Sequence, residues 1–420
     1  MEYYDIGIIG GGAAGLMAAV CAAQECRKNR IPARIAVLEA NPRVGKKLLA
    51  TGNGRCNLTN RNLSAEHYHG DTDLAMPLFK KYTTQRIIDQ FSSLGLLCRE
   101  REEGRIYPNN LQASAVLDIL RFQLEILGVK SLTDFHAATV KKSGATFTVH
   151  SQSGAVSAKR LIFACGGKAY PQFGSNGSGY PILKSLGHSL TELFPALVQV
   201  KTDPARAKPL KGARSAVCAT LLAGGKPVKT VCGEVQFTEN GLSGICIFEL
   251  SRLVGELKAA KKLEIALDLL PDYTEEEVFA MLKALRETLG LMPAEELLGG
   301  CVNKLVGRGV IRAALRRIPR QANEYCTDDL KAIAKTVKDF RFEVTGTLSW
   351  KDAQVTAGGV PLKEVDENLQ SRFCPGLYLA GELLNIDGDC GGFNLHWAWS
   401  TGMAAGTACA LSLRKNKGGT

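Results

Sequence analysis

Three glycines near the start of the chain have the types and spacing to bind a pyrophosphate. Gly10, Gly12 and Gly15 form a GxGxxG turn between an apolar segment, residues 3–9, and a helix-compatible run, residues 16–20. The first glycine of such a turn permits the bend, the second lets the backbone approach a phosphate, and the third lets the helix pack on the strand. The free N–H groups of the helix N-terminus then point at the phosphates. The turn therefore predicts a nucleotide site.

An acidic residue follows at the end of the second predicted strand. Glu39 comes directly after the apolar residues 35–38 and is placed to accept the ribose hydroxyls of an adenosine. It lies a little more than the usual distance of about 20 residues after the glycine turn. The polar residues 24–30 explain the extra length, because they would extend the end of the helix. A chance glycine turn is the alternative interpretation. The order strand, turn, helix, strand and acid favours the nucleotide site.

The opening fingerprint does not separate FAD from NAD, but the C-terminal region favours FAD. Residues 377–382 again read as a strand and a turn, and they would return Glu382 to the same sheet, where a ribityl chain needs a hydroxyl partner. Gly391 and Gly392 then open a last helix near Asn394. The N-terminus of that helix would stabilise an anionic reduced flavin.

Two side chains are candidates for chemistry, and each has a plainer interpretation. Cys56, in the long loop after Glu39, could be a redox thiol or an attachment point for a flavin, or it could simply fit a crowded loop. His396 lies in the first turn of the last helix, where the positive helix end would keep the imidazole neutral. It could donate a hydrogen bond to flavin or substrate, or be a packed histidine between Leu395 and Trp397.

Other residue patterns exclude several kinds of chemistry. Cys21 and Cys26 are five residues apart on the first helix and would point to different faces, which argues against a dithiol reductase. Tyr107 and Tyr170 could supply protons or line a pocket. We find no Ser/His/Asp arrangement for nucleophilic catalysis, no P-loop and no set of metal ligands, so we expect no metal.

The composition limits the compartment and the partners. None of the thirteen cysteines forms a CxxC motif, and most, such as Cys165, Cys218 and Cys246, read as small buried hydrophobes, which fits a reducing compartment. Residues 6–23 are apolar enough to resemble a membrane span, but their glycines indicate a buried strand–turn–helix unit. No signal-peptide pattern precedes or follows them. We predict a cytoplasmic protein that does not associate with a membrane.

The charge leaves a nucleic-acid partner open without favouring it. The net charge is +11, which permits an anionic partner. The basic residues are spread out and are not interleaved with aromatic residues, as they are in many single-strand binding sites. We therefore predict a small-molecule substrate and do not expect nucleic acid. Nothing in the sequence sets the oligomeric state.

The chain of 420 residues is long enough for two or three domains. The pattern of predicted helices and strands that must position these residues changes along it. Helices are predicted near 84–94 and 114–127, and a hairpin over 139–142 and 145–150. From about Pro195 short strand-like pieces indicate an antiparallel barrel or sandwich, and residues 274–336 are helical with a capped start at Thr274. The simplest topology is an α/β nucleotide domain with a two-part insertion at roughly 193–346. The tail from 414 reads as disordered.

At this point the chain resembles a known family. The order of GxGxxG, GKKLLATGNGRCNLTN, GRIYPNN, ACGGKAYP, TENGLSG, TAGGV and GLYLAGELLNIDGDCGGFNLHWAWSTG is similar to that of the HI0933/YhiN-type flavoproteins. That group includes proteins described as aminoacetone oxidases and as BaiN-type bile-acid enone reductases. The resemblance spans nearly the whole chain. It implies a discontinuous, glutathione-reductase-like FAD-binding Rossmann domain (residues 1–192 and 347–420), a β-barrel insert (193–272 and 337–346) and a helical sub-insert (273–336).

The resemblance also implies a set of cofactor contacts, motif by motif. The pyrophosphate would lie on the first glycine turn, the adenosine ribose on Glu39, and the isoalloxazine at the start of the last helix. The family usually has Thr where this chain has Cys165, and often Gln where it has His396. The residues so implied are Gly10, Gly12, Ala13, Ala14 and Gly15 at the pyrophosphate; Glu39; Val140, through its backbone, at adenine; Lys46, Lys47, Arg55 and Asn57 in the cofactor loop; Gly166; Gly381, Glu382 and Asp387 at the ribityl region; and Gly392, Asn394 and Leu395 at the isoalloxazine.

Three functional hypotheses follow. In the first, NAD(P)H reduces the flavin, and the hydride passes to an activated C=C bond, as in a 3-oxo steroid or bile-acid derivative. The chain has no second GxGxxG motif for a resident nicotinamide nucleotide, so NAD(P)H would have to bind transiently. The absence of that motif is the main argument against this hypothesis. The second is a small-amine oxidase that releases hydrogen peroxide. The third, which we do not favour, is an RNA-binding, tRNA-modifying flavoprotein.

Overall fold

The computed structural model describes residues 1–259 and 262–414, which fall into two units. The first unit contains Met1–Phe194 together with the segment that begins at Gln354, and the second contains Pro195–Ala353. The second unit thus interrupts the first at residues close to the 193 and 346 expected from the sequence. The tail predicted to be disordered lies, from residue 415, outside the described residues.

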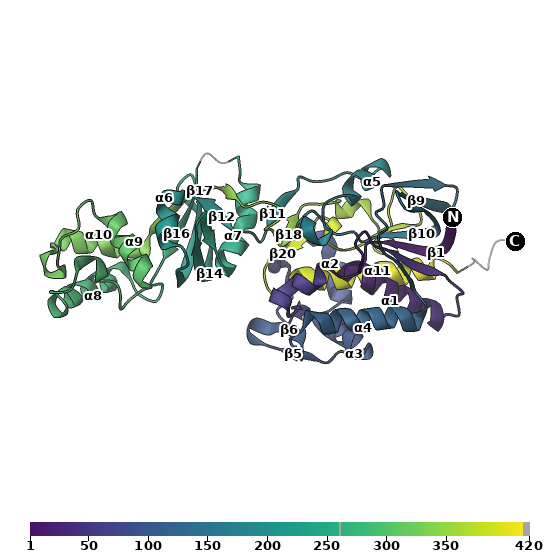
Figure 1. The fold of residues 1–420 in the computed structure, drawn as a ribbon, viewed down its shortest axis with the longest axis horizontal. Coiled ribbons are helices and arrows are strands. Elements are labelled where there is room, and N and C mark those ends of the chain that lie inside the picture. Colours follow the sequence, from purple (N-terminus) through teal and green to yellow (C-terminus); the bar gives the residue numbers. More distant parts are fainter. Residues whose placement is uncertain (260–261, 415–420) are drawn as a thin grey trace. The chain divides into compact units, whose positions relative to one another are not determined.

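The first unit contains a sheet with strand order β7-β2-β1-β10-β9-β8; its strands β1, β10 and β9 are labelled in Figure 1. The strands run parallel from β7 to β10, and the central strands β2, β1 and β10 are mostly buried, as in doubly wound folds. Strand β19 adds to β10 in the same direction and returns the C-terminal part of the chain to the sheet. The strands are β1 (Glu2–Ile9), β2 (Ile35–Leu38), β7 (Lys130–Leu132), β8 (Thr139–Ser143), β9 (Thr146–Ser151), β10 (Gly154–Phe163) and β19 (Leu377–Leu379).

Two helices from opposite ends of the sequence lie side by side in this unit: α1 (Ala13–Lys28) and α11 (Phe393–Leu411) (Figure 1). They approach so closely because α11 presents glycines to α1: a Cβ on Gly402 would lie 2.5 Å from the Ala14 carbonyl oxygen, and one on Gly406 would lie 2.3 Å from that of Ala18. The second contact lies four residues after the first on α11 and also four residues after it on α1. The two helices therefore run in the same direction.

Smaller elements complete the first unit around this sheet and helix pair. Short antiparallel ladders join β3 (Thr59–Asn60), β6 (Arg105–Pro108) and β5 (Cys98–Glu100), and join β20 (Ile386–Gly388) to β4 (Tyr68–Gly70). The helices predicted near 84–94 and 114–127 are present, as is the predicted hairpin, β8–β9. The further helices are α2 (Thr72–Lys81), α3 (Thr84–Ser93), α4 (Ala113–Leu127) and α5 (Gly179–Ser185).

The second unit is a closed β-barrel with a helical insertion. The barrel order is β12-β15-β14-β13-β16-β17, and helices α8, α9 and α10 occupy the chain between β16 and β17. The capped start predicted at Thr274 is confirmed, since the Glu277 N–H donates to Thr274 Oγ1 at 3.2 Å and the Thr274 N–H to Glu277 Oε2 at 2.8 Å. The elements are β12 (Val200–Thr202), β13 (Arg214–Ala223), β14 (Lys226–Thr238), β15 (Gly241–Ser243), α7 (Ile245–Glu256), β16 (Leu263–Asp268), α8 (Glu275–Thr288), α9 (Lys304–Ala314), α10 (Thr327–Lys338) and β17 (Phe340–Thr347).

One expectation about the cysteines is wrong. Cys218 is not a small buried hydrophobe but forms a disulfide with Cys232. The two residues lie directly opposite each other in the antiparallel register of β13 and β14, an arrangement that brings side chains into contact. The sequence could not show this pairing because it depends on the hairpin register. Cys165 is half-buried and Cys246 is buried.

The apolar stretch at residues 6–23 forms the end of β1, the glycine turn and the first part of α1, all within the core. Its hydrophobicity is thus explained by burial. Among the helices of the described residues, none combines the length and the apolar character needed to cross a membrane.

Candidate functional site

The first and third glycines of the fingerprint are fixed by backbone contacts. Gly10 has a φ of +100°, and a Cβ there would lie 2.4 Å from the Ala164 carbonyl oxygen. A Cβ on Gly15 would lie 1.9 Å from the carbonyl oxygen of Gly10. No side chain fits at either place, so these glycines let the turn pass β10 and let α1 start directly against the turn.

Gly12 differs from both, because a Cβ there would have no atom within 4 Å. The residue caps α1 without a side-chain hydrogen bond, so the first N–H groups of the helix, including those of Ala13 and Ala14, face this open space. A helix N-terminus that is open, unobstructed and not capped by a side chain is suited to an anion. The space over Gly12 fits the pyrophosphate that the sequence predicts.

Glu39 connects the end of β2 to the glycine turn. Its Oε2 accepts a hydrogen bond from the Gly11 N–H at 2.7 Å, and its Oε1 accepts from the N–H and Nδ2 of Asn41 at 2.8 and 2.7 Å. The side chain is 7% exposed. A carboxylate can accept about four hydrogen bonds, so three are used and one position is left for a hydroxyl. This is consistent with the predicted ribose contact.

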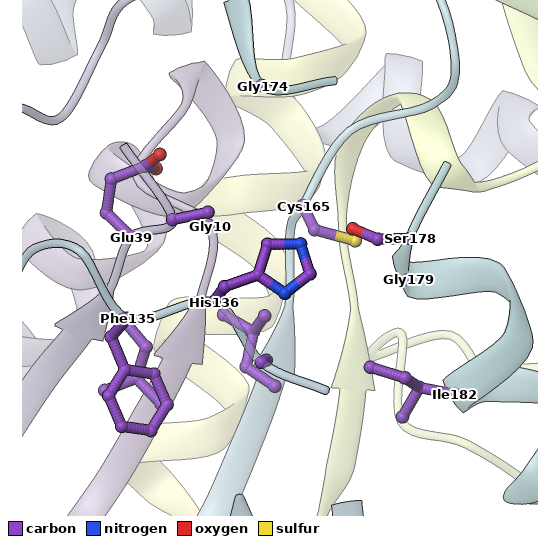
Figure 2. A pocket seen from close by; sticks show the side chains of 13 residues that line it. Gly10, Glu39, Phe135, His136, Cys165, Gly174, Ser178, Gly179 and Ile182 are labelled. Atoms are coloured by element: carbon purple, nitrogen blue, oxygen red, sulfur yellow. The ribbon is translucent and has the colours of Figure 1, made fainter. Parts of the chain in front are cut away.

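An open hollow lies beside Glu39, where the predicted ribose contact would place an adenosine. Residues 135–137 form one wall of this hollow. Figure 2 shows the His136 ring between Gly10 and Glu39 on one side and Cys165 and Ser178 on the other. Val140 lies three residues further along, in β8, and does not line the hollow. Residues 136–137, which the sequence analysis did not single out, line the hollow and are further candidates for the adenine contact, and the contact of Val140 stays a prediction.

A second group of predicted residues meets near the C-terminal end of β10. The Lys47 ammonium lies 2.7 Å from Glu382 Oε2, and the other oxygen of Glu382 accepts the Thr356 N–H at 2.9 Å. A Cβ on Gly166 would contact Ser175 Oγ at 3.0 Å and Glu382 at 3.8 Å. Ser175 Oγ is buried with no hydrogen-bond partner in the part of the chain described. A polar ligand at this place would satisfy groups that the protein leaves incomplete.

Gly381 links this group to the start of α1 and to the body of α11. Its N–H donates to Thr401 Oγ1 at 2.9 Å, its carbonyl accepts from the Trp397 indole N–H at 3.2 Å, and a Cβ would lie 2.8 Å from that of Ala14. It is thus held between the start of α1 and the body of α11. The structure thus places Gly381 against Ala14 and pairs Lys47 with Glu382, and the cofactor contacts of these residues stay predictions.

The N-terminus of α11 is built from a tight loop. Asn394 accepts the Gly388 N–H at 2.9 Å and donates to the Gly388 carbonyl at 2.6 Å. A Cβ on Gly392, whose φ is +100°, would lie 2.8 Å from Asn57 Oδ1, and that oxygen has no hydrogen-bond partner among the described residues. The buried Asn57 therefore supports the start of α11 and still lacks one donor.

The spacing of the two helix N-termini fits an extended dinucleotide. Gly402 of α11 faces Ala14 of α1, so Phe393 lies nine residues nearer the start of its helix than the contact does. At a rise of about 1.5 Å per residue, the α11 N-terminus lies roughly 12 Å beyond that of α1. One helix end can therefore face a pyrophosphate while the other faces a flavin ring. Donors, open space and incomplete polar groups all fit FAD.

The other predicted contact residues are less clearly placed. Lys46 and Arg55 are exposed on the loop, Leu395 is half-buried, and Asp387 is 2% exposed within β20. Among residues 1–259 and 262–414, no hydrogen bond or ion pair holds the Lys46 or Arg55 side chain at the glycine turn. Their roles stay predictions.

His396 is fully buried in the structure. Its Nδ1 lies 2.8 Å from Thr59 Oγ1, its ring lies 6.1 Å from that of Phe79, and it has no exposed surface. Burial lowers the pKa of His396 from its ordinary value of 6.5 to about 4, against an opposing contribution from the backbone of Tyr82. A side chain with no exposed surface has no face for a substrate. The geometry favours the packed histidine, and the neutral imidazole agrees in direction with the expectation.

A pH prediction follows from this burial. As the pH falls from 7 to 4 the unfolded chain binds a proton on His396 before the folded chain does, so folding stability is lost over that range. The loss due to this residue should be on the order of 3 kcal/mol. Chemical unfolding of the protein and of His396→Gln at pH 7, 5.5 and 4 should show a smaller acid loss in the variant. Equal slopes would contradict a buried neutral His396.

Cys56 is also fully buried, and it adopts a φ of +58°. Burial raises the pKa of its thiol to about 12. A reactive thiol needs both exposure and thiolate character, and Cys56 has neither. The structure favours the plain interpretation, in which Cys56 fits a crowded loop.

Tyr107 and Tyr170, the two candidate proton donors, are half-buried. A Cβ on Gly52 would lie 3.7 Å from Tyr107 Cε1, which places this ring at the cofactor loop beside Asn57. Tyr170, with a φ of +60°, packs its ring against Phe173 at 5.5 Å. Neither position decides between proton donor and pocket wall.

The structure contains a Ser–His–Glu arrangement that the sequence did not reveal. His188 Nδ1 lies 2.9 Å from Glu364 Oε2, and its Nε2 lies 2.9 Å from Ser371 Oγ. All three are buried, and Ser371 Oγ also accepts the N–H groups of Phe373 and Cys374. A serine that is 4% exposed and bonded to its own loop does not present a nucleophile. The network fixes the 362–374 segment.

Comparison with known proteins connects this geometry to a family. The profile of the HI0933-like protein Rossmann domain matches residues 4–408. The chain is 37% identical over 408 residues to a 3-dehydro-bile acid delta(4,6)-reductase of Clostridium scindens, covering 96% of this chain and 98% of that protein. It is 27% identical to a ribosomal RNA dihydrouridine synthase of Haemophilus influenzae, covering 99% of each. The open conformation of a flavocytochrome c3 fumarate reductase shares the fold, with a TM-score of 0.51 and 15% identity over 99% of this chain and 79% of that one.

Proposed function

The chain belongs to the HI0933-like flavoprotein family and is an FAD-dependent oxidoreductase, and we propose that it reduces a C=C bond conjugated to a carbonyl with electrons from NAD(P)H. The specific substrate class is a 3-oxo steroid or bile acid. The observation that carries this proposal is the similarity, over almost the whole of both chains, to a reductase of such a substrate. We further propose that the reaction takes place in the cytoplasm.

The chain's own residues would bind and orient the cofactor. The open space over Gly12 would take the pyrophosphate, the remaining acceptor position of Glu39 would take the ribose, and the Lys47–Glu382 pair would contact the ribityl chain. The N-terminus of α11 would stabilise negative charge on the ring. When bound, FAD carries the hydride between the nicotinamide and the double bond.

RNA is a second candidate substrate. The chain is similar over its full length to a ribosomal RNA dihydrouridine synthase, and its net charge of +11 favours a polyanion. The chemistry is shared, because the C5=C6 bond of uridine is also conjugated to a carbonyl. This proposal revises the expectation, made from the sequence, of no nucleic-acid partner. Neither relative is named as a small-amine oxidase, the second hypothesis of the sequence analysis.

Product analysis separates these candidates. The holoenzyme is incubated with NADH or NADPH and, in parallel, with a 3-oxo-4,6-diene bile acid or with an unmodified ribosomal RNA transcript. A third reaction contains aminoacetone and oxygen without nicotinamide. The proposal expects loss of the conjugated diene absorbance. Dihydrouridine formed instead would move the substrate to RNA, and amine-dependent peroxide would establish the oxidase and overturn the reductase.

A further inference from the structure

A carboxylate shared by two imidazoles lies beside the N-terminus of α11. Asp389 Oδ1 is 2.9 Å from His69 Nε2, and Asp389 Oδ2 is 3.5 Å from His67 Nδ1. We call these three residues the His–Asp–His cluster. None of them was singled out in the sequence, because Asp389 is some 320 residues from the two histidines.

The backbone holds the cluster in place. Residues 386–388 of β20 pair with residues 68–70 of β4, with Asp387 opposite His69, and the Asp389 N–H donates to the His67 carbonyl at 2.9 Å. The His67 ring stacks on Phe393, the first residue of α11, with ring centroids 4.3 Å apart and planes 17° apart. The cluster therefore lies on fixed elements, next to the helix end that fits the flavin ring.

Exposure differs within the cluster in a way that suits proton transfer. The Asp389 side chain is 8% exposed, while His69 is 22% and His67 is 38% exposed. A carboxylate that is this buried is costly unless it is paired, and both of its oxygens face an imidazole. The carboxylate is thus hidden behind two rings that reach the surface, and the Nε2 of His67 is left available because Nδ1 faces Asp389.

We propose that His67 is the proton donor for the carbon–carbon double bond, and that Asp389 and His69 position it. Reduction of a conjugated C=C adds a hydride to the β-carbon and a proton to the α-carbon. In the proton half of the reaction the Nε2–H bond of His67 breaks, a C–H bond forms at the α-carbon, and the imidazole becomes neutral. Asp389 balances the positive charge of the ring before the transfer, and water restores the proton afterwards. The inference rests on the proposed function, since it needs an acceptor that must be protonated on carbon.

The test compares two acceptors of the same reduced flavin. Anaerobic stopped-flow spectroscopy follows reduction by NAD(P)H and then reoxidation, either by the 3-oxo-4,6-diene or by ferricyanide, which takes electrons without protonation of carbon. His67→Gln should reduce as the wild type does and should react with ferricyanide at the same rate. Its reoxidation by the diene should fall by about 10²–10⁴-fold, the range for loss of a general acid. His150→Gln, on β9 of the same unit, is the matched control and should leave every rate unchanged.

A second readout does not depend on the reaction. Long-range ¹H–¹⁵N spectra of the imidazoles should show protons on both ring nitrogens of His67, the form that donates, and a proton on Nε2 of His69, and Asp389→Asn should change both patterns. If His67→Gln slows both acceptors equally, or neither, the residue is structural or irrelevant and the proposal is overturned. If wild-type reduced flavin reacts with ferricyanide but with no conjugated C=C, the proposed function fails, and the proton-donor role fails with it.

Discussion

Gly12→Val should abolish FAD retention while leaving the folded protein nearly as stable as the wild type. A Cβ at Gly12 meets no atom within 4 Å, and its φ of −82° and ψ of −168° suit a β-branched residue. The side chain would enter only the space that fits the pyrophosphate. We expect FAD affinity to fall by about 100-fold or more, equivalent to about 2.7 kcal/mol. The free energy of unfolding without cofactor should change by no more than about 1 kcal/mol.

The measurement pairs fluorescence titration of the cofactor-free protein with FAD and urea unfolding of the same sample. Gly15→Ala is the control, because its Cβ would lie 1.9 Å from the Gly10 carbonyl oxygen. That overlap forces a backbone shift, so the control should lose about 2–3 kcal/mol of stability even without cofactor. Unchanged FAD affinity in Gly12→Val would show that the pyrophosphate does not lie over this residue.

Gly406→Val should destabilise the first unit and release FAD together. A Cβ at Gly406 would lie 2.3 Å from the Ala18 carbonyl oxygen, so the variant must separate α11 from α1. We expect a loss of about 3 kcal/mol, typical of overpacking against backbone. Because both helix N-termini contribute to the cofactor site, separation should also lower the flavin content of the purified protein.

Thr407→Val tests the specificity of that result. Thr407 is the next residue on α11 and is half-buried, so valine there should cost less than about 1 kcal/mol. Thermal unfolding and the flavin-to-protein absorbance ratio report the two effects. Equal stability and flavin content in the two variants would contradict the close parallel packing of α1 and α11.

The sequence was sufficient for the fold because its strongest signals are local. The order of strand, glycine turn, helix, strand and acid specified β1, α1, β2 and Glu39, and the α/β class with an inserted barrel is confirmed. Thr274 and Glu277 likewise signalled a capping box within four residues. Each of these patterns acts through neighbours along the chain, so its physics can be read without tertiary structure.

The features that could not be predicted from the sequence depend on contacts between residues that are set by the tertiary fold. The Cys218–Cys232 bridge needs the register of β13 and β14, and the Ser371–His188 contact needs two loops to meet. The hollow beside Glu39 is lined by residues 135–137, which precede β8, and their place beside Glu39 depends on the tertiary fold. His396 was correctly placed in the first turn of α11, but the sequence did not show which way its ring points.

The two candidate substrates would undergo the same reaction. A conjugated enone and a uridine ring both accept a hydride on one carbon and a proton on the next. The two relatives that suggest these substrates each cover nearly all of the chain. We therefore expect the choice between an enone and a uridine to depend on residues that recognise the rest of the substrate, and not on the cofactor site.

The most direct test is an anaerobic absorbance spectrum of the purified, yellow protein. NADH or NADPH is added first, and a 3-oxo-4,6-diene bile acid second. The account predicts that the flavin absorbance bleaches with nicotinamide and returns with the diene, while the diene absorbance is lost in equal amount. A flavin that stays oxidised with both nicotinamides would contradict the central claim and would favour an enzyme whose own substrate reduces the flavin.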